Sequence, residues 1–184
     1  MTPGKNRYFI ALVLPSPLFE RVLEVKHYFQ VHYHSKASLN SPPHITLHMP
    51  FEWNPEKESN LMAGINELSL QLGSVSLELR DFGCFAPRVI FINVTPSPSL
   101  THMQKQVRQS SKRKFGLFNA DYQERTFYPH VTVAFRDLKK PMFVKAWAEF
   151  EQKSFHGEFL ADRIALLKHD GKKWEVHHEF LLPG

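Results

Sequence analysis

The sequence predicts an α+β fold, formed by a single domain over residues 1–184 with an internal pseudo-twofold repeat. Two observations predict it. Segments with strand periodicity and segments with helix periodicity alternate along the chain, and 42% hydrophobic residues, with 13% aromatic residues, suffice for a substantial core. The order strand, helix, strand occurs twice, and in both copies the second strand carries the pattern His-x-Thr.

The first half of the chain supplies one copy of this order and a further helix. Its predicted elements are a strand at Tyr8–Leu14, a helix at 17–33, a strand within 42–51 and a helix at Glu56–Leu72. Pro15 closes the first apolar run, and apolar side chains recur at spacings of three and four residues in both helical segments. Gly73 follows the second helix as its stop.

The second half repeats the order and adds a group of strands at its end. Its predicted elements are strands at Val75–Phe85 and Val89–Val94, a helix at Ser99–Phe115, a strand within 128–135, a helix at Met142–Gln152, and strands at Phe155–Asp162, Arg163–His169 and Trp174–Leu182. The short segment FAPR joins the first two strands as a hairpin, and a DGK turn joins the last two.

Two short motifs carry the chemistry that the sequence suggests. They are PPHITLHMPF at residues 42–51 and YPHVTVAF at residues 128–135. Alternate residues of a strand share a face, so each motif presents an imidazole and a hydroxyl side by side. A lone His-x-Thr is best explained as an incidental pair in a core or on a sheet face. Two copies, each directly after a proline, favour a shared site.

If the two halves pack around a pseudo-twofold axis, both polar faces line one cleft. Two imidazoles across a cleft suit general acid–base catalysis near pH 7, because one can act as a base in its neutral form and the other as an acid in its protonated form. The threonine hydroxyls can donate hydrogen bonds to anionic oxygens, which indicates phosphate as the group that is bound. Activated water is the expected nucleophile.

The composition excludes several classes of protein and of site. The sole cysteine, Cys84, permits no internal disulfide and no cysteine-based metal site, as expected of a cytoplasmic protein. No apolar run approaches the roughly 20 residues of a membrane span. The net charge of +5 is a weak signal for polyanions, and a dense basic cluster within 105–114 is either a solvated helix face or a phosphate-binding surface.

The ordered set of motifs resembles the two-histidine (2H) phosphoesterases, in the branch of 2′-5′ RNA ligases and cyclic phosphodiesterases. The matching pieces are RYFIALVLP, PPHITLHMPF, DFGCFAPRVIFINV, YPHVTVAFRD and RIALLKHDGKKWEVHHEFLL, in the order of the family. The resemblance implies a bilobal fold in which two mostly antiparallel sheets flank a central cleft with the helices outside. It also implies hydrolysis of a 2′,3′-cyclic phosphate or a 2′-5′ phosphodiester, with 2′-5′ RNA ligation as the reverse reaction.

The resemblance assigns roles to four residues and suggests others. His44 and His130 would be the catalytic pair, and Thr46 and Thr132 would bind the phosphate. Six more positions are substrate-binding candidates, each with a structural alternative such as core packing: Phe85 and Arg88 at the hairpin tip, Phe127 and Tyr128 before the second motif, Arg136 after it, and His48 on the face of His44.

No metal and no cofactor is expected. The pairs His32/His34 and His177/His178 invite a metal interpretation, but no carboxylates converge with them in the sequence. The expected partners are RNA termini or a small nucleotide, no membrane is expected, and the chain is expected to be a monomer. The alternative function is a non-catalytic protein that binds nucleotide or RNA phosphate. The residue types do not decide which histidine is the acid and which is the base.

Overall fold

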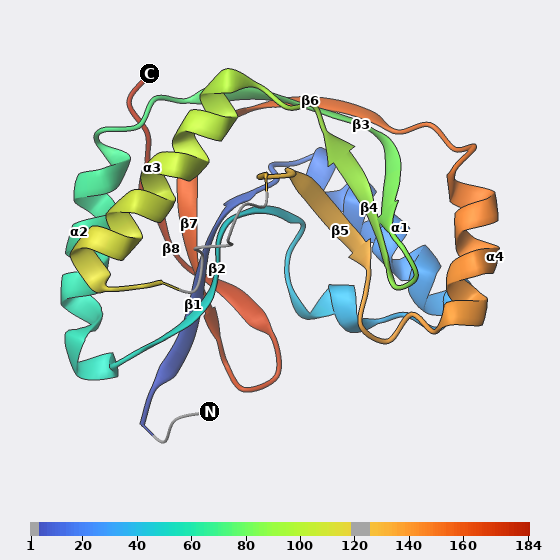
Figure 1. Ribbon diagram of the computed structural model, residues 1–184, viewed down its shortest axis with the longest axis horizontal. Coiled ribbons are helices and arrows are strands. Elements are labelled where there is room, and N and C mark those ends of the chain that lie inside the picture. The colour runs from blue at the N-terminus through green and yellow to red at the C-terminus, as the bar shows by residue number, and fades with distance from the viewer. Residues whose placement is uncertain (1–3, 119–125) are drawn as a thin grey trace.

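Two antiparallel four-stranded sheets form the centre of the computed structural model, which describes residues 4–118 and 126–184 (Figure 1). The elements, in chain order, are β1 Asn6–Val13, α1 Leu18–Tyr33, η1 Ala37–Asn40, β2 His44–Trp53, η2 Pro55–Lys57, α2 Glu58–Ser69, β3 Val75–Phe85, β4 Val89–Val94, α3 Pro98–Phe115, β5 His130–Ala134, α4 Lys140–Phe150, β6 His156–Ala161, β7 Arg163–His169 and β8 Trp174–Leu181.

The strand order places both His-x-Thr strands at sheet edges that meet in the middle of the molecule. One sheet has the order β2-β1-β7-β8 and the other has the order β5-β4-β3-β6, so β2 and β5 are edge strands. The strand pairs within both sheets are antiparallel, and β2 contacts β5 across the gap between the sheets. The polar faces of the two motifs therefore border the same central space.

The two long helices are exchanged between the lobes. α1 joins β1 to β2 of the first sheet, yet it packs against β5 and α4 in the other lobe (Figure 1). α3 joins β4 to β5 and packs against β2 and α2. The ring of Phe29 on α1 lies 4.6 Å from that of Phe150 on α4, and Trp53 on β2 lies 5.6 Å from Phe115 on α3. Each helix thus connects two strands of one sheet and packs against a strand of the other sheet.

Local sequence explains where α3 begins and ends. Ser97 accepts a hydrogen bond from the backbone N–H of Leu100, and Pro98 occupies the first turn, where its missing N–H costs nothing. Basic side chains occupy the last turn, which complements the helix dipole, and Gly116 closes the helix with a left-handed φ of 63°.

The structure confirms the predicted α+β fold with two antiparallel sheets around a central cleft and helices outside. Both predicted hairpins form, and β3 and β4 have the predicted bounds. The sequence did not predict η1, a short 3₁₀ helix before the first motif. Within the described residues, no helix combines the length and the apolar character that a membrane crossing requires.

Candidate active site

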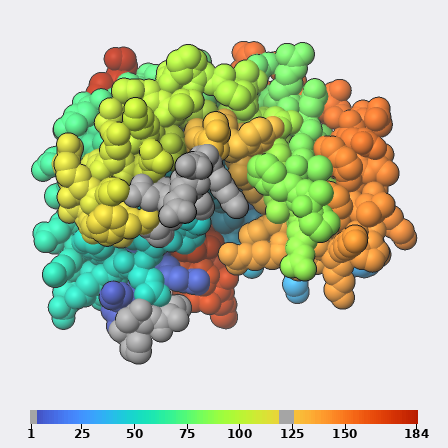
Figure 2. Space-filling model, in the orientation of Figure 1, coloured from blue at the N-terminus to red at the C-terminus, as the bar shows by residue number. Residues whose placement is uncertain are grey.

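Two cavities border β2, and Thr46 lines both of them. The first, of about 500 Å³, contains His130. The second, of about 220 Å³, contains His44 and Thr132. The surface is hollowed between the two lobes, below the centre of the view in Figure 2. The two cavities meet at Thr46, and together they form one cleft that all four residues of the two motifs line.

The backbone fixes the orientation of both imidazole rings in the same way. Nδ1 of His44 lies 2.7 Å from the carbonyl oxygen of Pro42, and Nδ1 of His130 lies 2.7 Å from that of Tyr128. A carbonyl oxygen only accepts, so Nδ1 carries the proton in each ring. Nε2 is therefore left to accept a proton when the ring is neutral and to donate one when it is charged.

An aromatic ring on the neighbouring strand supports each imidazole. The ring of Phe9 on β1 lies 4.8 Å from that of His44, and the ring of Phe91 on β4 lies 4.9 Å from that of His130. Gly83, opposite Phe91 in the β3–β4 pair, makes room for this arrangement, because a Cβ there would lie 2.5 Å from the Phe91 ring. Packing and backbone hydrogen bonds together hold both imidazoles in place.

Burial lowers the pKa of both histidines. The pKa of His44 falls to about 4, chiefly through burial. The hydrogen bond to Pro42 opposes this change, and the positive charges of Lys26 and His130 add to it. Burial also lowers the pKa of His130, against the effect of its bond to Tyr128. Both rings are therefore neutral at pH 7 without a ligand, and a bound phosphate anion favours protonation of a ring beside it.

The two threonine hydroxyls are free to bind a ligand. Thr46 and Thr132 are half-buried, and within residues 4–118 and 126–184 neither hydroxyl has a hydrogen-bond partner. Because such a hydroxyl has no hydrogen bond to the protein, it can donate to a phosphate oxygen without breaking one.

The larger cavity combines aromatic and basic walls. Phe85 lies 5.3 Å from the His130 ring at right angles to it, and Phe127 and Tyr128 line the same cavity, so the substrate-binding role predicted for these three positions stays a prediction. The opposite wall comes from α3 and includes Lys105 and Arg108. Arg88, the fourth candidate near this site, is exposed at the hairpin tip and lines neither cavity.

The smaller cavity has a basic rim. Arg136 lines it together with His169, the last residue of β7, and Lys172 from the turn between β7 and β8. β5 ends at Ala134, and Arg136, which has a left-handed φ of 57°, lines the cavity that contains His44 and Thr132. A role in substrate binding stays a prediction for Arg136.

The sequence comparisons identify the family of the chain. A model described as the 2′-5′ RNA ligase superfamily matches residues 14–173. The chain belongs to the 2′-5′ RNA ligase superfamily. A "Putative phosphoesterase" of Geobacillus sp. (strain WCH70) is 28% identical over 181 residues, 97% of each chain. A protein of the same name from Bacillus licheniformis is 31% identical over 144 residues, which cover 77% of this chain and 80% of the relative.

Solved structures share the fold of this 2′-5′ RNA ligase superfamily member. TT0787 of Thermus thermophilus matches with a TM-score of 0.71 and 21% identity, over 97% of this chain and 98% of that one. E. coli LigT complexed with 3′-AMP matches with a TM-score of 0.67 and 19% identity, over 98% and 99%. The resemblance to the 2H phosphoesterases is thus confirmed at the level of family and fold.

The prediction that His48 reaches the cleft is wrong for this superfamily member. His48 is 1% exposed, its Nδ1 donates to the carbonyl oxygen of Met49 at 2.9 Å, and its ring packs edge-on against Phe51. The pairing of β1 with β2 shifts register on both sides of the pair Ile10 and His48. This bulge breaks the strict alternation from which the prediction was made, and it turns His48 inward.

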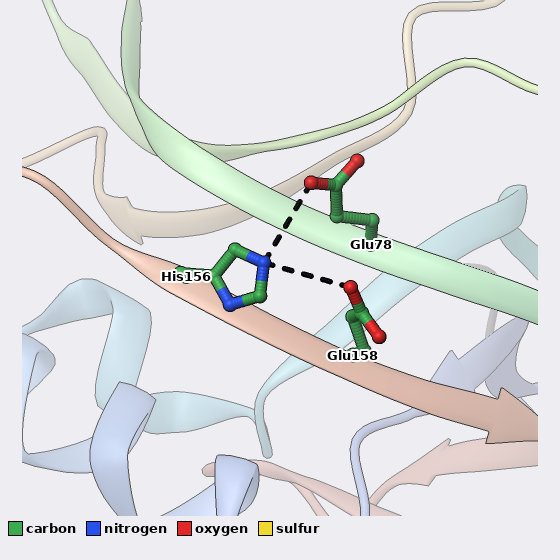
Figure 3. A group of neighbouring side chains, drawn as sticks. All are labelled: Glu78, His156 and Glu158. Carbon is green, nitrogen blue, oxygen red and sulfur yellow. Dashed lines mark ion pairs between the residues drawn. The ribbon is translucent and has the colours of Figure 1, made fainter.

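The histidine pairs that invited a metal interpretation are dispersed. His32 packs against Tyr28 with the two rings tilted, His177 pairs with Glu58, and His178 packs against Phe180. In the described part of the chain, one group of His and carboxylate side chains converges, formed by Glu78, His156 and Glu158 (Figure 3). These side chains come from β3 and β6, outside both cavities, and ion pairs of 3.7 and 3.6 Å to His156 link them.

Sequence reasoning missed several residues of the site in this 2′-5′ RNA ligase fold. Phe9 and Phe91 gave no signal beyond their strand pattern, because an aromatic strand residue is most often core. For Lys26 the sequence indicated an exposed side chain, since a lysine in an amphipathic helix is normally at the surface. The structure places Lys26 at 1% exposure, behind the segment that leads into the first motif.

Proposed function

We propose that the protein is a metal-independent phosphoesterase that hydrolyses a 2′,3′-cyclic phosphate or a 2′-5′ phosphodiester of RNA or a nucleotide. One observation carries the proposal: both imidazoles have Nδ1 bound to a backbone carbonyl two residues earlier, beside a free threonine hydroxyl in a shared cleft. This arrangement leaves two Nε2 atoms for proton transfer and two hydroxyls for a phosphate.

In the proposed reaction one histidine takes a proton from water as the water oxygen attacks phosphorus. The other histidine donates a proton to the ribose oxygen that leaves. Thr46 and Thr132 hold the non-bridging oxygens, where negative charge accumulates in the transition state. With a 5′-hydroxyl in place of water, the same proton transfers open a 2′,3′-cyclic phosphate: the hydroxyl oxygen bonds to phosphorus, the bond to the 3′ oxygen breaks, and a 2′-5′ phosphodiester forms, which is ligation.

Two lines of support favour a nucleotide substrate. LigT has been solved with 3′-AMP, phosphate, ATP and NADP+. In this chain, the aromatic side chains of Phe85 and Tyr128 offer a surface on which a base stacks, and Lys105 and Arg108 across the cavity suit further phosphates. A cytoplasmic location and a monomeric state stay predictions.

A substrate panel in millimolar EDTA tests the proposal. We expect 2′,3′-cyclic nucleotides or 2′-5′ linked dinucleotides to be cleaved at the same rate with and without EDTA, and matched 3′-5′ dinucleotides to be left intact. Added Zn²⁺ should inhibit, because a metal bound to Nε2 prevents that atom from transferring a proton. Chromatography that separates the 2′- and 3′-phosphate isomers reports the products.

Two outcomes would contradict the proposal in different ways. Loss of activity in EDTA, restored by Mg²⁺ or Mn²⁺, would indicate metal-assisted hydrolysis. Nucleotide binding without turnover on the whole panel would favour the alternative, a non-catalytic phosphate-binding protein.

A further inference from the structure

The smaller cavity is left over when a nucleotide with a single base is placed in the site. The aromatic surface for that base, on Phe85 and Tyr128, belongs to the larger cavity. The smaller cavity, of about 220 Å³, has an aromatic wall of its own that includes Trp174, and both cavities reach Thr46. A phosphate held by Thr46 can therefore carry one group into each cavity.

The neighbours of Trp174 hold its ring in a fixed orientation. The centre of the indole lies 4.8 Å from that of the Phe9 ring and 4.9 Å from that of the His169 ring, edge-on in both pairs. The guanidinium of Arg7 lies 5.4 Å from the centre of the indole. Because Trp174 is half-buried and lines the cavity, it offers a preformed surface on which a nucleobase can stack.

Hydrogen bonds order the turn between β7 and β8, which borders the same cavity. The carboxylate of Asp170 accepts from the N–H groups of residues 172 and 173, both at 2.7 Å, and the Asp170 N–H donates to the carbonyl oxygen of Lys173 at 3.0 Å. Gly171 adopts a positive φ of 105°, which glycine tolerates. The turn thus holds Lys172 at the rim of the smaller cavity.

The rim of the smaller cavity offers donors to an anion. Nδ1 of His169 accepts from the Gly171 N–H at 3.1 Å, so the neutral ring carries its proton on Nε2. Within residues 4–118 and 126–184, Arg136 and Lys172 have no ion pair, and no carboxylate lines this cavity. An aromatic wall beside cations without a partner suits a nucleoside that is followed by a phosphate.

We propose that the smaller cavity is a subsite for a second nucleoside of the substrate, whose base stacks on Trp174 and whose next phosphate lies at Lys172. Trp174 and Lys172 then favour a phosphodiester with a nucleoside on both sides over a cyclic mononucleotide. The inference rests on the proposed function and names the substrate class for it.

Two substrates that differ by one nucleoside test the subsite. A 2′-5′ linked adenosine dinucleotide fills both cavities, whereas 2′,3′-cyclic AMP fills the larger one. We expect Trp174→Ala to lower kcat/KM for the dinucleotide by roughly 5- to 150-fold, the usual effect of removing a stacked aromatic side chain, and to leave hydrolysis of cyclic AMP unchanged. Trp174→Phe keeps an aromatic ring and should recover most of the loss.

Two kinetic outcomes would overturn the proposal. Equal losses for both substrates in folded Trp174→Ala would show that the indole acts by supporting Phe9, whose ring packs against His44 at 4.8 Å. Unchanged kinetics with the dinucleotide would show that no base stacks on Trp174. If thermal unfolding shows that Trp174→Ala does not fold, Trp174→Leu gives the same test, because leucine keeps apolar bulk but has no aromatic face.

Lys172 and Lys173 form a matched pair for the second part of the proposal. Both lie in the turn, but Nζ of Lys173 pairs with Glu175 at 2.8 Å, and Lys173 does not line the cavity. With a 2′-5′ linked trinucleotide, we expect Lys172→Met to lower kcat/KM roughly 2- to 5-fold at low salt and less at high salt, because an exposed contact is screened. Lys173→Met should change nothing. The same loss in both variants would overturn the role of Lys172.

Tryptophan fluorescence gives a readout that does not depend on turnover. In a His130→Ala background, which slows cleavage, we expect the dinucleotide to quench the emission more when Trp174 is present than in Trp174→Phe. Cyclic AMP should quench both proteins equally. Equal quenching by the dinucleotide in both proteins would overturn the subsite. If the wild-type protein cleaves no substrate, the proposed function fails, while this titration still decides whether a second base lies on Trp174.

Discussion

Replacing His44 or His130 by alanine is expected to lower kcat by roughly 10²- to 10⁴-fold, the usual contribution of a positioned proton-transfer group. Each ring has its Nδ1 proton committed to a backbone carbonyl, so only Nε2 is available to the substrate. Either change removes that atom and leaves the cavity open to water, which is a poor acid and base at pH 7. The measurement is single-turnover and steady-state kinetics on the best substrate of the panel.

The fold should tolerate both substitutions. Both rings are half-buried at the cleft rather than part of the core cluster, so the melting temperature should change by only a few degrees. His27→Ala, at an exposed histidine on α1, is the matched control and should keep full activity. Full activity in folded His44→Ala or His130→Ala would remove that residue from the mechanism.

Replacing Thr46 or Thr132 by valine is expected to cost about 1.5 to 3 kcal/mol of interaction with a charged phosphate, roughly 10- to 150-fold in kcat/KM. Valine keeps the shape of threonine but has no hydroxyl. Neither hydroxyl has a hydrogen-bond partner among the described residues, so its loss breaks no internal hydrogen bond. The substitution should therefore weaken the interaction with the substrate phosphate.

Thr46 should be the more sensitive position, because it lines both cavities whereas Thr132 lines one of them. Thr95→Val is the matched control: its hydroxyl bonds to Glu78 outside both cavities, and its loss should leave kinetics unchanged. Unaltered kcat and KM in both cleft variants would show that the two hydroxyls are structural.

Periodicity predicted much of this fold because most elements obey simple local rules. The hairpin of β3 and β4 has alternating apolar residues and a proline-containing tip, and the helices have apolar faces and recognisable ends. The two His-x-Thr motifs were predicted to share a cleft, and the structure brings them to edge strands that meet.

The features that sequence could not predict depend on packing between distant segments. The bulge that buries His48 arises from the pairing of β2 with β1, and the left-handed turn at Arg136 follows the early end of β5. Lys26 is buried because α1 crosses to the other lobe, an exchange that helix periodicity does not encode. These same features break the pseudo-symmetry of the site.

The pH dependence of kcat/KM tests the central claim, an acid–base pair of histidines, most directly. The base must be neutral and the acid protonated, so activity should rise as pH increases through one pKa and fall as it increases through the other. Since burial lowers the pKa of His44 to about 4 and lowers that of His130, both limbs should lie below about pH 6.5, the ordinary pKa of histidine, in the free enzyme. We predict a bell-shaped profile that loses one limb in His44→Ala and the other limb in His130→Ala. A profile that keeps both limbs in either variant would contradict the account.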